Sequence, residues 1–120
     1  MRTRSVFKAS LATSNEVIYT VPNNTDAKWL MTFASNSAGS TRNNVIIKVR
    51  ATRKNTSNVD VEQIVVVLGS KSLSAGEHIL LGDGNFTYLE AGDTIEGSAG
   101  GTGVGVILTL EETTGIVSTR

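Results

Sequence analysis

Four carboxylate side chains lie close together in the second half of the chain, and their oxygens are the ligand type that Ca²⁺ prefers. They are Asp83, Glu90, Asp93 and Glu96. Their spacing does not match an EF-hand loop, which places ligands at positions 1, 3, 5 and 12. We therefore interpret them as solvated acids of turns. If a cation binds, we expect it at residues 82–85 together with Asp93.

His78 is the only histidine in the sequence. With a serine and either Asp83 or Asp93 it could form a catalytic triad, in which histidine is the general base. However, the sequence has no Gly-x-Ser-x-Gly motif to hold a nucleophilic serine, and His78 lies within an apolar strand pattern at 77–81. We interpret His78 as a structural or surface residue, and we predict no catalytic residue and no enzyme activity.

The glycine-rich segment 97–103 (GSAGGTG) is similar to phosphate-binding loops in composition only. No Lys-Ser or Lys-Thr pair follows it, and no helix is predicted whose N-terminus could bind phosphate. We therefore predict that this segment is a mobile hairpin tip.

Basic residues are concentrated in segment 42–54, where they could contact the phosphates of a nucleic acid. They are Arg42, Lys48, Arg50, Arg53 and Lys54. Surfaces that bind single strands also place aromatic side chains among the charges, and this segment has none. We therefore expect an outward strand face or an acidic protein partner rather than nucleic acid.

Three aromatic residues, Tyr19, Trp29 and Tyr88, could form a platform on which a sugar stacks. Trp29 alternates in phase with Met31 and Phe33, which is typical of a strand side that faces the core. We therefore expect Trp29 to be buried, whereas an accessible Trp29 would favour sugar binding.

The residues considered above must lie on β-strands or on the turns between them. Apolar residues recur mainly at every second position, as in strands, rather than every 3.6 positions, as in helices. Alternating segments occur at 16–21, 28–34, 45–51 and 104–110. The residues expected on the inner faces are Val17, Tyr19, Val21, Trp29, Met31, Phe33, Val45, Ile47, Val49, Ala51, Val104, Val106, Leu108 and Leu110. About eight short strands separated by turns predict one all-β domain over 1–120, a β-sandwich or jelly-roll-like fold of antiparallel strands.

Segment 64–68 (IVVVL) breaks the alternation because it is apolar on both faces. Such a strand is either central and covered, or it buries its second face against another chain. Since an exposed flat edge of this composition favours aggregation, we expect self-association. We predict an apolar seam formed by Ile64, Val66 and Leu68, with polar contacts at its rim from Arg50 and Arg53.

Turn residues separate the strands. Residues 82–85 (GDGN) are typical of a tight hairpin loop, because glycine adopts positive φ without a Cβ clash. Segments 73–77 (LSAGE) and 89–93 (LEAGD) share the pattern Leu-x-Ala-Gly-acid, and each precedes a short strand. We interpret these two segments as copies of one turn type.

The chain has no net charge, but residues 1–60 carry nine bases and three acids (+6), whereas residues 61–120 carry two bases and eight acids (−6). Either the two halves interleave in one sandwich, or opposite poles guide the stacking of copies. The absence of cysteine excludes disulfides and thiolate metal sites. No apolar segment approaches the roughly 20 residues that span a bilayer, and no apolar segment follows the arginines of 1–5, so we expect no signal peptide.

Two groups of motifs resemble a class of small virion proteins of tailed bacteriophages. The first is 17–22 (VIYTVP), followed by a polar turn and an apolar strand that ends in 34–37 (ASNS). The second is 73–77 together with 89–96 (LEAGDTIE). The resemblance covers roughly residues 16–110. It implies a β-sandwich without catalysis that sits on a capsid, neck or tail, often in a symmetric ring or trimer, and it assigns no functional residues.

We therefore predict a non-enzymatic virion structural protein, either a capsid decoration or cement protein or a neck or tail component, assembled in the host cytoplasm. Its partners would be other virion proteins and further copies of itself, without membrane, cofactor or metal. The predicted contact residues are Arg2, Arg4, Arg50, Arg53, Ile64, Val66 and Leu68. Segments 1–5 and 113–120 are predicted to be flexible arms. The alternative is a carbohydrate-binding or host-recognition fibre module.

Overall fold

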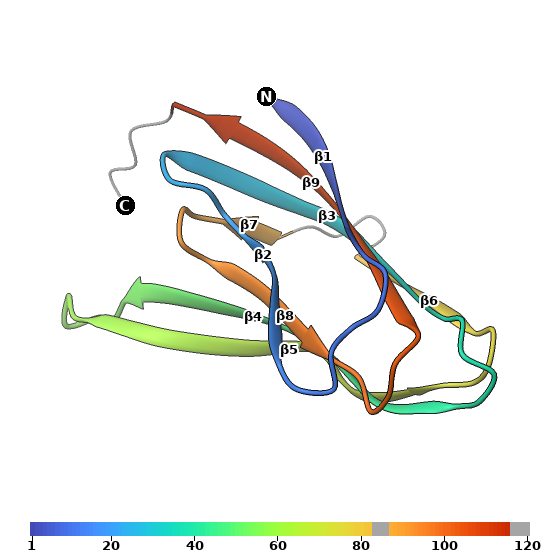
Figure 1. Cartoon of the computed structure of the whole chain (residues 1–120). Helices are drawn as coiled ribbons and strands as arrows, with labels where there is room; N and C mark the ends of the chain where they lie inside the picture. The colour runs from blue at the N-terminus through green and yellow to red at the C-terminus, as the bar shows by residue number, and fades with distance from the viewer. Residues whose placement is uncertain (83–86, 116–120) are drawn as a thin grey trace.

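The computed structural model describes residues 1–82 and 87–115, which form strands and no helix (Figure 1). The strands are β1 (Arg2–Lys8), β2 (Glu16–Thr20), β3 (Thr25–Asn36), β4 (Arg42–Lys54), β5 (Asp60–Leu73), β6 (His78–Leu81), β7 (Thr87–Leu89), β8 (Thr94–Ser98) and β9 (Val104–Thr114). The prediction of an all-β domain is confirmed. No helix in the described ranges is long and apolar enough to cross a membrane. Most of the predicted hairpin loop at 82–85 lies outside the described residues.

Two antiparallel sheets pack against each other. The first has the order β1-β9-β3-β6, with β7 also paired to β3, and the second has the order β2-β8-β4-β5. Figure 1 shows them as two layers, and the long hairpin of β4 and β5 extends from one end of the second layer. The core between the layers includes Leu11, Val21, Val45, Ile47, Leu73, Ile95, Leu108 and Leu110. The predicted β-sandwich is therefore confirmed.

Alternation predicted most inner-face residues of β4 and β9 correctly. The confirmed buried positions are Val45, Ile47, Val104, Val106, Leu108 and Leu110. Val49 is partly buried and packs against the same core. Burying one such side chain stabilises the fold by roughly 1.5–3 kcal/mol, so β9 alone supplies a large part of the hydrophobic stabilisation.

A β-bulge in β3 makes the prediction for Met31 and Phe33 wrong. Trp29 is buried opposite Leu110, but the register with β9 shifts between Trp29 and Met31. An inserted residue moves every later side chain to the other face. Met31 and Phe33 are therefore only half-buried, and Thr32 turns inward instead.

A second β-bulge lies between Val17 and Tyr19 on β2. Tyr19 is buried as expected, but Val17 is 54% exposed. The prediction that Val17 shares the inner face with Tyr19 is therefore wrong, for the same reason as in β3.

The two segments with the Leu-x-Ala-Gly-acid pattern form the same turn, as predicted. In each, the leucine is buried and the glycine has positive φ, 79° at Gly76 and 92° at Gly92. The acid at the end of each turn accepts a hydrogen bond from the backbone N–H three residues earlier, at 2.8 Å for Glu77 and 2.9 Å for Asp93. The shared sequence therefore predicts a shared local geometry.

Both turns also attach to the sandwich in the same way, each at the end of another strand. The N–H of Gly76 donates to Asn36 O at 2.8 Å, and the N–H of Asn36 donates to Glu77 O. The N–H of Gly92 donates to Val21 O at 3.0 Å, and the N–H of Val21 donates to the backbone O of the acid that ends the second turn. The first turn is thus hydrogen-bonded to the C-terminal end of β3, and the second turn is hydrogen-bonded to the residue that follows β2.

The glycine-rich segment 97–103 packs closely against β4, contrary to the prediction of a mobile tip. The N–H of Gly100 donates to Asn43 O at 2.8 Å, and a Cβ at Gly100 would lie only 2.5 Å from that oxygen. Ala99 is buried, and its N–H donates to Ala12 O at 3.0 Å. Glycine therefore permits close approach of two backbones here.

The predicted N-terminal arm is a strand, so this prediction is wrong. β1 pairs with β9 along its whole length, from Arg2 opposite Glu112 to Lys8 opposite Val106. At the other end of the chain, Thr113 lies within β9 and pairs with β3. Residues 116–120 of the second predicted arm lie outside the described residues.

Candidate functional site

The outer edge of β5 exposes four consecutive apolar residues. β5 is the last strand of the second sheet, and no described strand pairs with its outer edge. Its apolar residues are exposed on both faces, Ile64 by 48%, Val65 by 61%, Val66 by 54% and Val67 by 42%. The predicted two-faced apolar strand is thus an edge strand rather than a central one, and its unpaired backbone groups can receive another strand.

Pairing with β4 determines which side chains of β5 share a face. Ile64 lies opposite Arg50 and Val66 lies opposite Lys48, while Val65 lies opposite Val49 on the other side. Opposed residues of an antiparallel pair point to the same face. Both faces of the edge therefore carry apolar surface.

Leu68 does not belong to the exposed seam that the sequence predicted. It is only 9% exposed and forms part of the hydrophobic core, where it pairs with Ile47. The register with β4 shifts beside Leu68, which turns this residue inward. Val67 lines a cavity of about 70 Å³ that also contacts Trp29 and Leu81.

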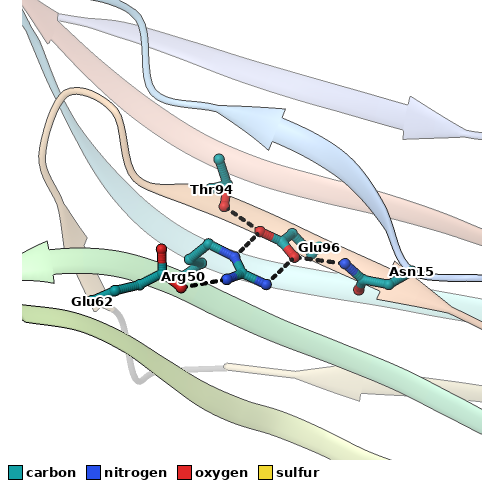
Figure 2. Close-up of polar contacts among 5 residues, drawn as sticks. All are labelled: Asn15, Arg50, Glu62, Thr94 and Glu96. Carbon is teal, nitrogen blue, oxygen red and sulfur yellow. Dashed lines mark hydrogen bonds and ion pairs between the residues drawn. The ribbon is translucent and has the colours of Figure 1, made fainter.

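Arg50 lies within an ion-pair network on the opposite side of β4 from the core (Figure 2). Its Nε–H donates to Glu96 Oε2 at 2.8 Å, and its Nη1–H donates to Glu62 Oε1 at 2.6 Å. Glu96 also accepts hydrogen bonds from Asn15 at 2.7 Å and Thr94 at 2.6 Å. The predicted rim residue Arg50 therefore has its guanidinium engaged within its own chain.

The environment of Glu96 strongly favours its charged form. The hydrogen bond from Arg50 is the largest cause that lowers the pKa of Glu96 from its ordinary 4.5 to about 2. Burial opposes this effect, and the hydrogen bonds from Thr94 and Asn15 add to it. Glu96 is thus a structural carboxylate that links β8 to β4.

Lowering the pH is expected to destabilise the fold through Glu96. Because its pKa is lower in the folded chain than in the unfolded chain, its contribution is fully present above pH 4.5 and is lost as the pH falls toward about 2. This contribution is roughly 3 kcal/mol at neutral pH. Urea unfolding across this pH range measures it, and Glu96→Gln should show a flatter decline. An equal decline in both proteins would contradict this role.

Arg53, the second predicted rim residue, also forms an internal ion pair. Its Nη1–H and Nη2–H donate to the two carboxylate oxygens of Asp93 at 2.9 and 2.6 Å, and its Nε lies 3.4 Å from Glu90 Oε2. Paired parallel bonds of this kind are among the strongest that a carboxylate makes. The structure thus uses Arg53 to hold the second turn against β4.

Arg2 and Arg4 of the predicted arm contact a buried carboxylate between the sheets. Arg2 Nη2 lies 3.0 Å from Glu112 Oε1, and Arg4 Nη1 lies 3.2 Å from Glu112 Oε2. The hydroxyl of Tyr19 also donates to Glu112, and Arg4 lies 5.5 Å from the centre of the Tyr19 ring. These contacts close the β1–β2 side of the sandwich, which we call the charged edge.

Burial alone would raise the pKa of Glu112. The hydrogen bond from Tyr19 and the charges of Arg2 and Arg4 outweigh it, so the pKa of Glu112 lies below its ordinary value. Burial and the contact with Glu112 raise the pKa of the Tyr19 hydroxyl well above 10. Glu112 is therefore charged and Tyr19 is neutral at physiological pH.

Several bases of the first half of the chain pair with acids of the second half. The pairs are Arg2–Glu112, Arg4–Glu112, Arg50–Glu96, Arg53–Glu90 and Arg53–Asp93. Of the two alternatives for the uneven charge, interleaving within one sandwich is therefore confirmed.

Among the described residues, the acids considered for cation binding form no group that could hold a metal ion. Asp93 and Glu96 each pair with an arginine, and no group of three or more potential ligands occurs among residues 1–82 and 87–115. Asp83 and Asn85 lie outside the described residues. His78 lies on the surface at the start of β6, with its ring 5.5 Å from that of Phe33.

The outer face of the first sheet carries an apolar row that the sequence pattern did not predict. Phe7 lies opposite Ile107, Ile107 lies opposite Phe33, and Phe33 lies opposite Leu80. Phe7 is 72% exposed and Leu80 is 45% exposed. We call these four residues the apolar row. It crosses four strands that are distant in the sequence, so only the register reveals it.

The three aromatic residues considered for sugar stacking do not share a surface. Trp29 is buried as predicted, and its indole N–H donates to Thr32 Oγ1 at 2.9 Å. Tyr19 is also buried, whereas Tyr88 is 68% exposed and has Lys28 Nζ 5.8 Å from its ring centre. Because an accessible Trp29 would favour sugar binding, the burial of Trp29 favours a structural role.

Comparison with known proteins adds little to this geometry. No protein family model matches the chain, and no curated protein matches it. One solved structure that it is similar to is described as "Family 16 Carbohydrate Binding Module-2". That similarity covers 86% of this chain and 72% of the other, with 9% sequence identity and a TM-score of 0.30. A similarity of this size carries no information about ligands. The chain is a β-sandwich whose most distinctive surface is an exposed apolar edge strand.

Proposed function

We propose that this chain is a structural subunit that binds neighbouring protein subunits and does not transform a substrate. We further propose that it serves in the virion of a tailed bacteriophage, as a capsid decoration or cement protein or as a neck or tail component. The observation that carries the proposal is the apolar outer edge of β5. Four consecutive exposed apolar residues on an unpaired edge are costly for a domain that functions alone.

The apolar row supports the same proposal. It lies on the outer face of the first sheet, whereas β5 forms the outer edge of the second sheet. A subunit with two separate apolar surfaces can join copies of itself through one and contact another protein through the other. Many weak contacts of this kind add up in a symmetric particle.

The motifs that resemble those of small phage virion proteins support the setting. The two turns with the Leu-x-Ala-Gly-acid pattern hold the ends of β2 and β3 to the rest of the sandwich. A rigid sandwich of this kind presents its outer surfaces in a fixed geometry, as a repeated lattice component must.

The proposed function is tested by adding the purified chain to virions of a phage in which the gene for this chain has been disrupted. We expect the chain to sediment with the particles, and to raise the temperature at which they release DNA if it acts as cement. The variant Phe7→Lys, which alters the apolar row but not the core, should sediment less. Absence of the chain from intact virions by mass spectrometry would overturn the proposal.

A second candidate function is glycan binding, and the exposure of Tyr88 favours it. Tyr88 borders a groove of about 330 Å³ that is also lined by Asp26, Lys28 and Glu111. An aromatic ring beside carboxylates and an amine can stack on a sugar and bind its hydroxyls. A glycan array probed with the chain and with Tyr88→Ala tests this candidate. Equal absence of signal from both would dismiss it.

A further inference from the structure

We propose that the β5 edge pairs with the β5 edge of a second copy, antiparallel and about a two-fold axis at Val66. The inference deepens the proposed function and rests on it for the role of the resulting dimer. The pairing would join two four-stranded sheets into one continuous sheet and bury the apolar residues of both copies. The partner is a second copy because the edge is complementary to itself in this orientation.

Charge makes the edge self-complementary. β5 begins with the acids Asp60 and Glu62 and carries the base Lys71 near its other end, and all three are exposed. Antiparallel pairing brings the acidic end of one copy beside the basic end of the other. Parallel pairing would place acids beside acids, which is unfavourable.

The acids at the start of β5 have partners on β4 and still face solvent. Asp60 Oδ1 lies 2.9 Å from Lys54 Nζ, and Glu62 Oε1 lies 2.6 Å from Arg50 Nη1. The Asp60 side chain is 66% exposed and the Glu62 side chain is 57% exposed. Their outer sides thus remain open to a second copy, whose Lys71, paired with Val45 on the other face of β5, would approach them at the end of the strand.

The position of the axis follows from the distribution of residues along the strand. Val66 lies at the middle of the exposed apolar residues and close to the middle of β5 (Asp60–Leu73). A two-fold axis perpendicular to the sheet places Val66 opposite its own copy and keeps the same faces of both sheets on the same side. The β5 sides of the two sandwiches then lie next to each other.

Single cysteines test this geometry cleanly, because the chain has no cysteine of its own. Opposed residues of an antiparallel pair have Cα atoms roughly 4.5–5.5 Å apart, within the range of a disulfide. Val66→Cys is expected to form a disulfide-linked dimer under mild oxidation. Lys71→Cys is expected to stay monomeric, because its copies would lie roughly 30 Å apart.

The two cysteine variants separate the possible arrangements. Cross-linking at Val66 alone supports the antiparallel pair. Cross-linking at both positions indicates parallel strands and overturns the proposal, and cross-linking at neither position overturns it as well.

A pair of lysine variants measures the contribution of the edge. Val66→Lys should lower the association constant by about a hundredfold or more, because each copy places the charge at the axis. Val17→Lys is the matched control, since Val17 has the same exposed fraction, 54%, and lies in the opposite edge strand of the same sheet. It should change association less than about threefold. Sedimentation analysis measures both, and circular dichroism checks that each variant is folded.

The results also separate this inference from the proposed function. A chain that stays monomeric at high concentration but sediments with virions overturns the β5 dimer and leaves the structural role in place. A chain that forms the β5 dimer but is absent from virions supports the dimer and overturns the phage setting.

Discussion

Replacing Asp93 with alanine is expected to lower the free energy of unfolding by about 3 kcal/mol. Its buried carboxylate accepts two hydrogen bonds from Arg53, at 2.9 and 2.6 Å, and a third from the backbone N–H of Glu90. The variant loses all three bonds and removes a buried acceptor from both the Arg53 guanidinium and the backbone N–H of Glu90. Urea unfolding at neutral pH measures the change.

The other turn supplies the matched control. Glu77 holds the same position in the first copy and accepts the same backbone bond from Ser74, but it is exposed, and no salt bridge to it is found within the described residues. Glu77→Ala should therefore cost less than about 1 kcal/mol. Equal losses in the two variants would show that the turn bond alone matters, and that the pair with Arg53 does not stabilise the fold.

Replacing Leu108 with alanine is expected to cost about 3–5 kcal/mol. Leu108 is fully buried in the middle of β9, the strand that pairs with both β1 and β3. The substitution removes apolar contacts and leaves a cavity that a close-packed core fills only in part. Thermal and urea unfolding should both show the loss.

Leu80→Ala is the control for this prediction. Leu80 lies on the same sheet, in β6, but is 45% exposed. Truncating it should cost less than about 1 kcal/mol, while it shortens the apolar row and should weaken docking. If both leucine variants lost the same stability, the core assignment of β9 would be wrong.

The sequence predicted the fold class because alternation is a local property. Val104, Val106, Leu108 and Leu110 could be assigned to an inner face from neighbouring residues alone. The same rule failed at Met31, because a β-bulge depends on how β3 fits β9 across the sheet. Nothing in residues 28–34 taken alone marks the inserted residue.

The candidate surfaces were predicted less completely, because they depend on contacts between residues that are distant in the sequence. Segment 64–68 was correctly identified as apolar on both faces, but its place at a sheet edge follows from topology. Glu96 and Asp93, the buried partners of Arg50 and Arg53, lie 46 and 40 residues away in the sequence, so the charges could be identified from the sequence but these ion pairs could not. The two turns were an exception, because the repeated Leu-x-Ala-Gly-acid motif correctly predicted a repeated local geometry.

The two sides of the sandwich should respond in opposite directions to ionic strength. The charged edge holds β1 with ion pairs to Glu112 and joins β1 to β2 through a contact of 3.3 Å between Lys8 and Glu16. Added electrolyte screens such pairs, whereas strongly hydrated anions such as sulfate strengthen apolar contacts like those of β5. In sulfate-rich solution, the ion pairs of the charged edge would thus weaken within each subunit. Association of subunits through the β5 edge, on the opposite side, would strengthen.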